Sequence, residues 1–280
     1  MKSLLIKSAI ASGVVLSLAA VTRPAMAASF VVSIEDAKVV NANLGNLTQA
    51  KVQTFDSQGT TNYSATGFEW KDGTTKIGTY TNTQIRTADQ YGGAGANSQY
   101  NNKNQYFDVD ASRSGNGQTV STLKLEQAQS YFGLWWSAGD ATNVLKFLSK
   151  GQVVQTITTA DVKNYISKLG TNSSTTTNPY YGNPTSAFQG QDSGEPFAFI
   201  NFYDVDGTFD QVEFTNAVNS NGTSSGFESD NHTVATGYTK YSGTIVTVVP
   251  ESSSLLGVLA IGLVGASSFL TRRVKKSSVA

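Results

Sequence analysis

Short runs of alternating polar and apolar residues, each ended by turn-forming residues, recur through the middle of the chain. Phe30–Ile34 and Val120–Leu125 alternate with a period of two, as expected for strands with one buried face. Asp72-Gly73 and Lys150-Gly151 separate further runs of this kind, and glycine accepts the positive φ that tight hairpin turns need. The pattern predicts an all-β fold, an antiparallel, jelly-roll-like β-sandwich with one short helix.

Two further segments refine this prediction. Phe197–Tyr203 is apolar on both faces, which predicts a central strand buried on both sides. Asp204–Gly207 is rich in turn-forming residues, and we expect Phe209–Thr215 to pair back after this turn.

One helix is predicted to begin after Thr158. Thr158 and Asp161 have the spacing of a capping box. Apolar side chains then recur on one helical face, at Val162, Tyr165, Ile166 and Leu169. Gly170 is well placed as the C-terminal cap, so we expect a helix of about ten residues lying on a sheet.

The amino-terminal segment has the features of a secretory signal peptide. Lys2 and Lys7 form a positive n-region, the short apolar stretch Ala9–Val21 follows, and Ala25-Met26-Ala27 fits a small-x-small cleavage site. Residues 1–27 are therefore expected to direct the chain to the Sec translocon, with cleavage between Ala27 and Ala28. An uncleaved anchor helix is the alternative.

An uncharged apolar run of sixteen residues, Leu255–Leu270, lies near the carboxyl end. At about 1.5 Å per residue it covers about 24 Å, slightly less than a hydrocarbon core of about 30 Å. A basic cluster follows it: Arg272, Arg273, Lys275 and Lys276. Because this cluster is costly to move through a bilayer, we expect a single transmembrane helix over 255–270 with a cytoplasmic tail and an exported body.

This tail resembles the PEP-CTERM sorting signal of exosortase-processed bacterial proteins, which combines a Pro-Glu-Pro box, a helix and an arginine-rich end. Here the box is Pro250-Glu251-Ser252, without the second proline, and the basic end includes Arg272 and Arg273. The resemblance implies an exosortase-like protease as a partner and residues 250–276 as the signal. A plain anchor that is never cut is the alternative.

Between these ends, residues 28–235 are expected to form one β-sandwich domain, and residues 236–249 a linker. Without the two targeting ends and Glu251, the body has nineteen acidic and thirteen basic residues. Such a surface does not favour nucleic acid as a partner. The chain has no cysteine, which excludes thiol nucleophiles, thiolate metal sites and disulfides.

Four stretches of the body are distinctive when taken together: Tyr91–Gly95, Tyr131–Asn143, Glu195–Phe202 and Gly226–His232. They resemble a family of cyanobacterial exosortase-dependent surface proteins. The resemblance implies an exported, membrane-sorted surface protein with a β-sandwich body, and it transfers no catalytic residue.

No cofactor is expected apart from a structural calcium ion, for which acidic residues suggest two candidate sites. The first contains Asp204, Asp206 and Asp210, an Asp-x-Asp-Gly-x-x-Asp cluster, for which an ordinary turn is the alternative. The second contains Glu228 and Asp230 on a late strand, by analogy with carbohydrate-binding sandwiches. Hydrogen bonding to loop amides is the alternative for Asp230.

Tyr131, Trp135 and Trp136 are candidates for stacking on sugar rings, with core packing as the alternative. Adjacent tryptophans on a strand point to opposite sides, so we expect one in the core and the other partly exposed. His232 is the chain's single histidine, and no Gly-x-Ser-x-Gly elbow accompanies it. We expect it on the surface of a strand and without a catalytic role.

These observations favour an exported, non-enzymatic β-sandwich that is anchored in the inner membrane, sorted by an exosortase, and structural or adhesive at the cell surface or in the extracellular matrix. A carbohydrate-binding module for extracellular polysaccharide is the first alternative. A secreted hydrolase is the second.

Overall fold

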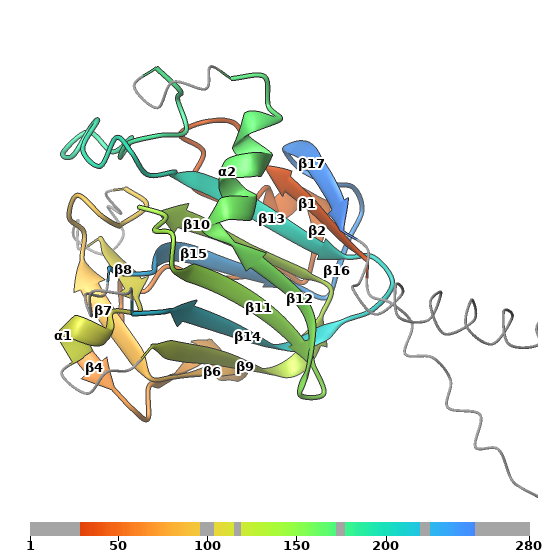
Figure 1. The fold of residues 1–280 in the computed structure, drawn as a ribbon. Coiled ribbons are helices and arrows are strands. Elements are labelled where there is room, and N and C mark those ends of the chain that lie inside the picture. Colours follow the sequence, from red (N-terminus) through yellow and green to blue (C-terminus); the bar gives the residue numbers. More distant parts are fainter. Residues whose placement is uncertain (1–28, 96–103, 115–118, 172–176, 219–224, 250–280) are drawn as a thin grey trace, which may run out of the picture.

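The computed structural model describes residues 29–95, 104–114, 119–171, 177–218 and 225–249 of this chain, which form two antiparallel sheets packed as a β-sandwich (Figure 1). The large sheet has nine strands: β17 (Thr244–Val249), β1 (Phe30–Ile34), β13 (Ala198–Asp204), β10 (Tyr131–Ser137), β15 (Glu228–Ala235), β8 (Gln105–Asp108), β7 (Thr83–Thr87) and β4 (Thr61–Ser64) in spatial order, with β3 (Lys51–Gln53) beside β15. The predicted all-β sandwich is confirmed.

The small sheet packs against one face of the large one. It has six strands: β12 (Gln152–Thr158), β11 (Asn143–Ser149), β14 (Phe209–Asn216), β9 (Val120–Gln129), β6 (Thr75–Thr81) and β5 (Phe68–Asp72). Two further strands, β2 (Leu47–Thr48) and β16 (Gly237–Tyr238), pair separately. The hairpins β5–β6 and β11–β12 turn at Gly73 and at Lys150-Gly151, as predicted, and all three residues have positive φ.

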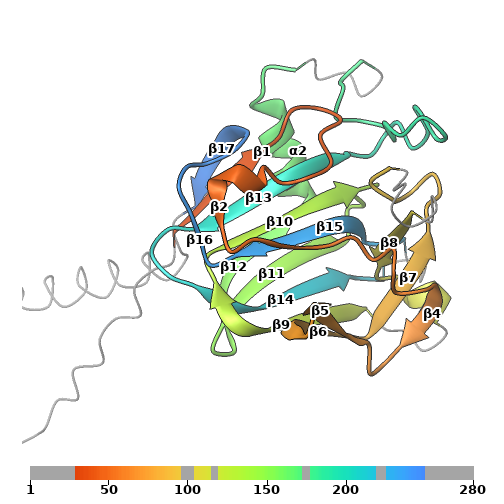
Figure 2. The same ribbon diagram turned by 180° about the vertical axis from the view of Figure 1, so that it is seen from behind.

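The main core lies between the sheets and is built from apolar side chains of both, including Phe132, Phe147 and Phe214. A second apolar cluster covers the opposite face of the large sheet, with Tyr131, Trp135 and Tyr203 among its members. Loop residues such as Val40, Ala50 and Tyr91 pack onto this second cluster; Figure 2 shows the long loop after β1 crossing this face. Consequently β13 is buried along its whole length, which confirms the prediction for Phe197–Tyr203.

The predicted helix is present as α2 (Thr159–Ser167) and begins with the expected capping box. The Thr158 N–H donates to Asp161 Oδ2 over 2.9 Å, and the Asp161 N–H donates to Thr158 Oγ1 over 3.2 Å. The helix ends at Ser167 and its C-cap is Lys168, so the prediction that Gly170 is the cap is wrong by two residues, although Gly170 has a positive φ of 69°. It packs against the edge strands β12 and β17 and closes one side of the core (Figure 1). Two shorter helical segments, η1 (Leu44–Asn46) and α1 (Ala111–Ser114), complete the described elements.

Two predictions about connectivity are wrong. Phe209–Thr215 does not form a hairpin with the preceding strand, because β13 already has β1 and β10 on its two sides; β14 instead crosses to the small sheet and pairs with β11 and β9. Residues 236–249 are not a linker, since they contain β16 and β17. β17 pairs with β1, with Val249 opposite Phe30, so the folded body extends to Val249.

The contribution of β17 to the core can be tested with two valines of the same strand. Val246 is 7% exposed and belongs to the main core, whereas Val248 is 59% exposed. Val246→Ala is expected to lower the free energy of unfolding by about 1–2 kcal/mol through lost burial, and Val248→Ala to change it by less than about 0.5 kcal/mol. Urea unfolding measures both. Equal, small effects would mean that this segment is a linker after all.

Candidate functional site

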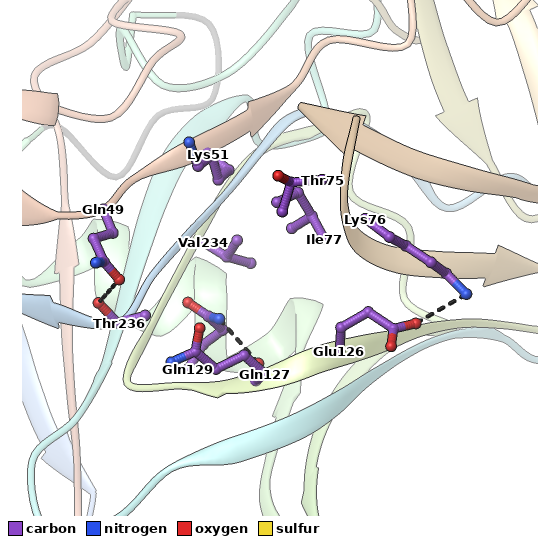
Figure 3. Close-up of a pocket in the computed structure, with 10 residues that line it drawn as sticks. All are labelled: Gln49, Lys51, Thr75, Lys76, Ile77, Glu126, Gln127, Gln129, Val234 and Thr236. Atoms are coloured by element: carbon purple, nitrogen blue, oxygen red, sulfur yellow. Dashed lines mark hydrogen bonds and ion pairs between the residues drawn. The ribbon is translucent and has the colours of Figure 1, made fainter. Parts of the chain in front are cut away.

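A cleft of about 320 Å³ opens between the two sheets, where β3 and β15 of the large sheet face β6 and β9 of the small sheet (Figure 3). Small-molecule pockets range from roughly 300 to 1,000 Å³, so this volume is at the lower end. The cleft is lined by Gln49, Lys51, Thr75, Lys76, Ile77, Glu126, Gln127, Gln129, Val234 and Thr236.

Amide and hydroxyl side chains supply half of this lining. Its aliphatic surface comes from the half-buried Ile77, since Val234 is only 1% exposed. Gln129 Nε2 donates to the Gln127 carbonyl over 2.9 Å, while the Gln127 side chain itself is exposed. On the other side, Thr236 Oγ1 donates to Gln49 Oε1 over 3.2 Å. A carboxamide offers both donors and an acceptor, so this lining suits a ligand rich in hydroxyl groups.

The charged residues of the cleft are already paired. Lys76 Nζ lies 2.9 Å from Glu126 Oε1 and 3.3 Å from Glu69 Oε1, and Lys51 forms an ion pair with Asp72. The hydrogen bond to Glu126 is the largest cause that raises the pKa of Lys76. Because these pairs are solvent-exposed, they add little stability, but they leave the cleft without a strong excess of either charge.

The three candidate sugar-stacking aromatics are not at this cleft or on the surface. Tyr131, Trp135 and Trp136 are all at most 1% exposed. Trp136 faces the main core and Trp135 the second cluster, as alternation predicts, but the loops over the second cluster cover Trp135 as well. The expectation that one tryptophan is partly exposed is wrong, and these rings pack rather than stack on sugars.

His232 is also in the core and not on the surface as predicted. It is fully buried, and its Nδ1 lies 3.0 Å from the Tyr80 hydroxyl and its Nε2 2.9 Å from Ser229 Oγ. Its ring stacks on Phe214 with 4.8 Å between ring centroids. Burial lowers the pKa of His232 well below the ordinary value of 6.5, so the imidazole is neutral in the fold.

The first candidate calcium cluster is dispersed. Asp204 Oδ1 accepts the Gly207 N–H over 2.8 Å, which is the turn alternative, and Asp206 is exposed. Asp210 accepts the Lys150 N–H over 3.2 Å, on the neighbouring β11–β12 hairpin. Within the described ranges, no three His, Cys, Asp or Glu side chains form a group that could hold a metal ion.

The second candidate pair, Glu228 and Asp230, lies in β15 and is buried. Asp230 Oδ2 accepts the Ala94 N–H over 2.8 Å and Oδ1 accepts the Asn231 N–H over 2.7 Å, so Asp230 holds the glycine-rich loop 91–95 onto the sheet. Burial raises the pKa of Asp230 despite these two bonds. Glu228 has different neighbours, Asp108 and Ser137.

The residues predicted for targeting lie outside the described part of the chain. They are Ala27, Ala28, Pro250, Glu251, Arg272 and Arg273, together with the predicted membrane helix 255–270. Among the residues that the structure does describe, no helix has the length and apolar character needed to cross a membrane. None of the protein-family models, curated proteins or solved structures compared with this chain matches it.

Sequence reasoning missed the cleft because its glutamines come from distant segments. Gln127 and Gln129 are two residues apart on β9, which is a local signal for a shared face of a strand. Gln49 and Thr236 belong to segments nearly two hundred residues apart in the chain, and they meet through the pairing of β2 with β16.

The state of His232 predicts a pH dependence of stability. Because the pKa of His232 is depressed in the folded state, the unfolded chain binds a proton below about pH 6.5 that the folded chain does not. The contribution of His232 to the free energy of unfolding is therefore complete above that pH and is lost below it, by up to about 1.4 kcal/mol per pH unit. His232→Gln removes this term. The free-energy difference between the wild type and His232→Gln, from urea unfolding at about pH 7.5 and about pH 5.5, should therefore shrink at the lower pH. A constant difference would contradict the buried neutral imidazole.

Proposed function

We propose that this chain is an exported, non-enzymatic surface protein whose jelly-roll-like sandwich has an adhesive role in the cell envelope or the extracellular matrix. One structural observation supports this most directly. β17 pairs with β1, so the start and the end of the described body lie side by side, with Val249 opposite Phe30 (Figure 1). A body of this kind can be held at one point by a C-terminal anchor and present its other surfaces outward.

The resemblance of the tail to a sorting signal supports the same proposal. The segment that contains Pro250 and Glu251 directly follows β17, so a protease acting there would release or transfer the whole sandwich without removing a strand. An exosortase-like enzyme is the partner that this arrangement fits.

Intact mass of the chain recovered from the envelope and from the medium tests the sorting step. We expect the exported form to lack residues 1–27 and the basic tail from Arg272 onward. Glu251→Ala, within the Pro-Glu box, should leave the tail on the exported form, whereas Ser253→Ala should not. An exported pool whose mass still includes Arg272–Lys276 in the wild type would contradict sorting by cleavage.

We infer further that the adhesive ligand is an extracellular polysaccharide and that the cleft holds it. The supporting observation is the lining: three glutamines and two threonines around the half-buried Ile77, with both lysines paired to carboxylates. Carboxamides and hydroxyls match sugar hydroxyls, and the aliphatic surface suits the apolar face of a sugar ring. In this proposal the glutamine side chains of the cleft bind the carbohydrate, and the buried aromatic residues Tyr131, Trp135 and Trp136 do not.

Affinity electrophoresis of the full chain in gels containing neutral polysaccharides tests this assignment. Gln127→Ala removes an exposed carboxamide of the cleft. It is expected to weaken binding about tenfold, which corresponds to the net free energy of one or two hydrogen bonds. Gln152→Ala, on the edge strand β12, is the matched control, since it removes an exposed glutamine outside the cleft. Equal retardation of both variants and the wild type would exclude the cleft as the binding site.

A further inference from the structure

Three strands of the large sheet meet at the end of the sandwich that is away from Phe30 and Val249. β10 ends at Ser137, β15 begins with Glu228, and β8 ends at Asp108. Ser137 is the register partner of Glu228.

β8 is the neighbour of β15 on its other side. There Ser229 pairs with Phe107, and Phe227 exchanges backbone hydrogen bonds of 3.2 and 3.3 Å with Val109. This antiparallel register places Glu228 opposite Asp108. Ser137, Glu228 and Asp108 therefore form one cross-strand row, which we call the distal row.

The two carboxyl groups of the distal row are close together. A Cβ atom built on Gly226 would overlap Glu228 Oε1 and would lie 2.6 Å from Asp108 Oδ1, so both oxygens surround the same glycine. Glu228 is 4% exposed, and Asp108 and Ser137 are fully buried. Acidic residues directly opposite one another are destabilising, and more so away from water.

Two polar atoms of the distal row have no hydrogen-bond partner. Glu228 Oε2 and Ser137 Oγ are both buried and both unsatisfied. Buried polar atoms in folded proteins are almost always satisfied, and an exception calls for an explanation such as an ion. Side chains of register partners lie on the same side of a sheet, so the Ser137 hydroxyl and the Glu228 carboxylate share one site.

The charges around the distal row are mostly negative. Burial is the largest cause that raises the pKa of Glu228, and the neighbouring Asp108, Asp140 and Glu195 raise it further. The cations that face this region are Arg86, whose Nε lies 3.7 Å from Asp108 Oδ2, and Lys163, which acts on Asp140 and Glu195. The site thus has an excess of carboxylates over cations, which favours a bound cation.

We propose that Glu228, Asp108 and Ser137 bind one calcium ion at this end of the sandwich. Calcium takes six to eight oxygen ligands in flexible geometry, from carboxylates, hydroxyl or carbonyl oxygens and water. Two carboxylates supply at most four of these oxygens, so water and backbone carbonyls complete the coordination. An affinity in the range of extracellular calcium modules, about 10⁻⁴–10⁻³ M, follows from so few charged ligands.

Thermal unfolding of the full chain in mild detergent tests the proposal, first after EDTA treatment and then with about 10 mM CaCl₂. Binding to the folded state alone is expected to raise the unfolding midpoint of the wild type by about 3 to 10 °C. Glu228→Gln should lose this response and, in EDTA, should unfold at or above the wild-type midpoint, because it removes the repulsion with Asp108. Ser137→Ala should fold normally and show a reduced response.

Asp206→Asn is the matched control, since Asp206 is an exposed carboxylate near the other end of the same sheet. It should keep the full response to calcium. The proposal is wrong if CaCl₂ does not shift the unfolding midpoint of the wild type. That outcome is expected if Glu228 and Asp108 share a proton and bind no ion. It is also wrong if Ser137→Ala and Glu228→Gln both respond like the wild type, or if Asp206→Asn alone abolishes the response.

Discussion

The burial of three adjacent strands on both faces is the constraint on which this structure depends. β13, β10 and β15 are buried along their full lengths in the middle of the large sheet. One face packs on the small sheet and the other is covered by loops. Large aromatic side chains can therefore occupy both faces: Phe132 lies opposite Phe202 on the inside, and Tyr131 opposite Tyr203 on the outside. The apolar area removed from water on both sides stabilises the middle of the sheet.

Double-sided burial also means that each polar side chain in these strands needs a partner within the protein. Asn201, in β13, is an example: its Oδ1 accepts the Tyr131 hydroxyl over 2.6 Å, and its Nδ2 donates to Glu35 Oε1 over 3.0 Å. Asp230 and His232 are satisfied in the same way by Ala94, Tyr80 and neighbouring residues. Against this background the unsatisfied Glu228 Oε2 and Ser137 Oγ stand out, because these two residues are register partners in adjacent strands.

Features that depend on a few consecutive residues could be predicted from the sequence. The hairpin turns at Gly73 and Lys150-Gly151 and the capping box of α2 need only local geometry, and the central strand needs only an apolar run. The partner of β14 was predicted wrongly because it depends on whether β13 still has a free edge, which is decided by β1 and β10, both distant in sequence. The strand 244–249 was missed for a similar reason: its pairing with β1 joins the two ends of the body.

The candidate sites were less predictable than the fold because strand register decides which side chains meet. Period-two reasoning places Ser229 and His232 on opposite faces, yet they are hydrogen-bonded to each other in the core. The register between β10 and β15 shifts between Gly133 and Trp135, and Asn231 has a positive φ of 51°, so one extra residue in β15 reverses the alternation. The bulge directs His232 inward and leaves Glu228 and Asp230 on the opposite face. One local irregularity thus buries the chain's single histidine away from the surface. It also aligns Glu228 with Ser137 and Asp108, three residues that are far apart in the sequence and meet only through the register of three strands.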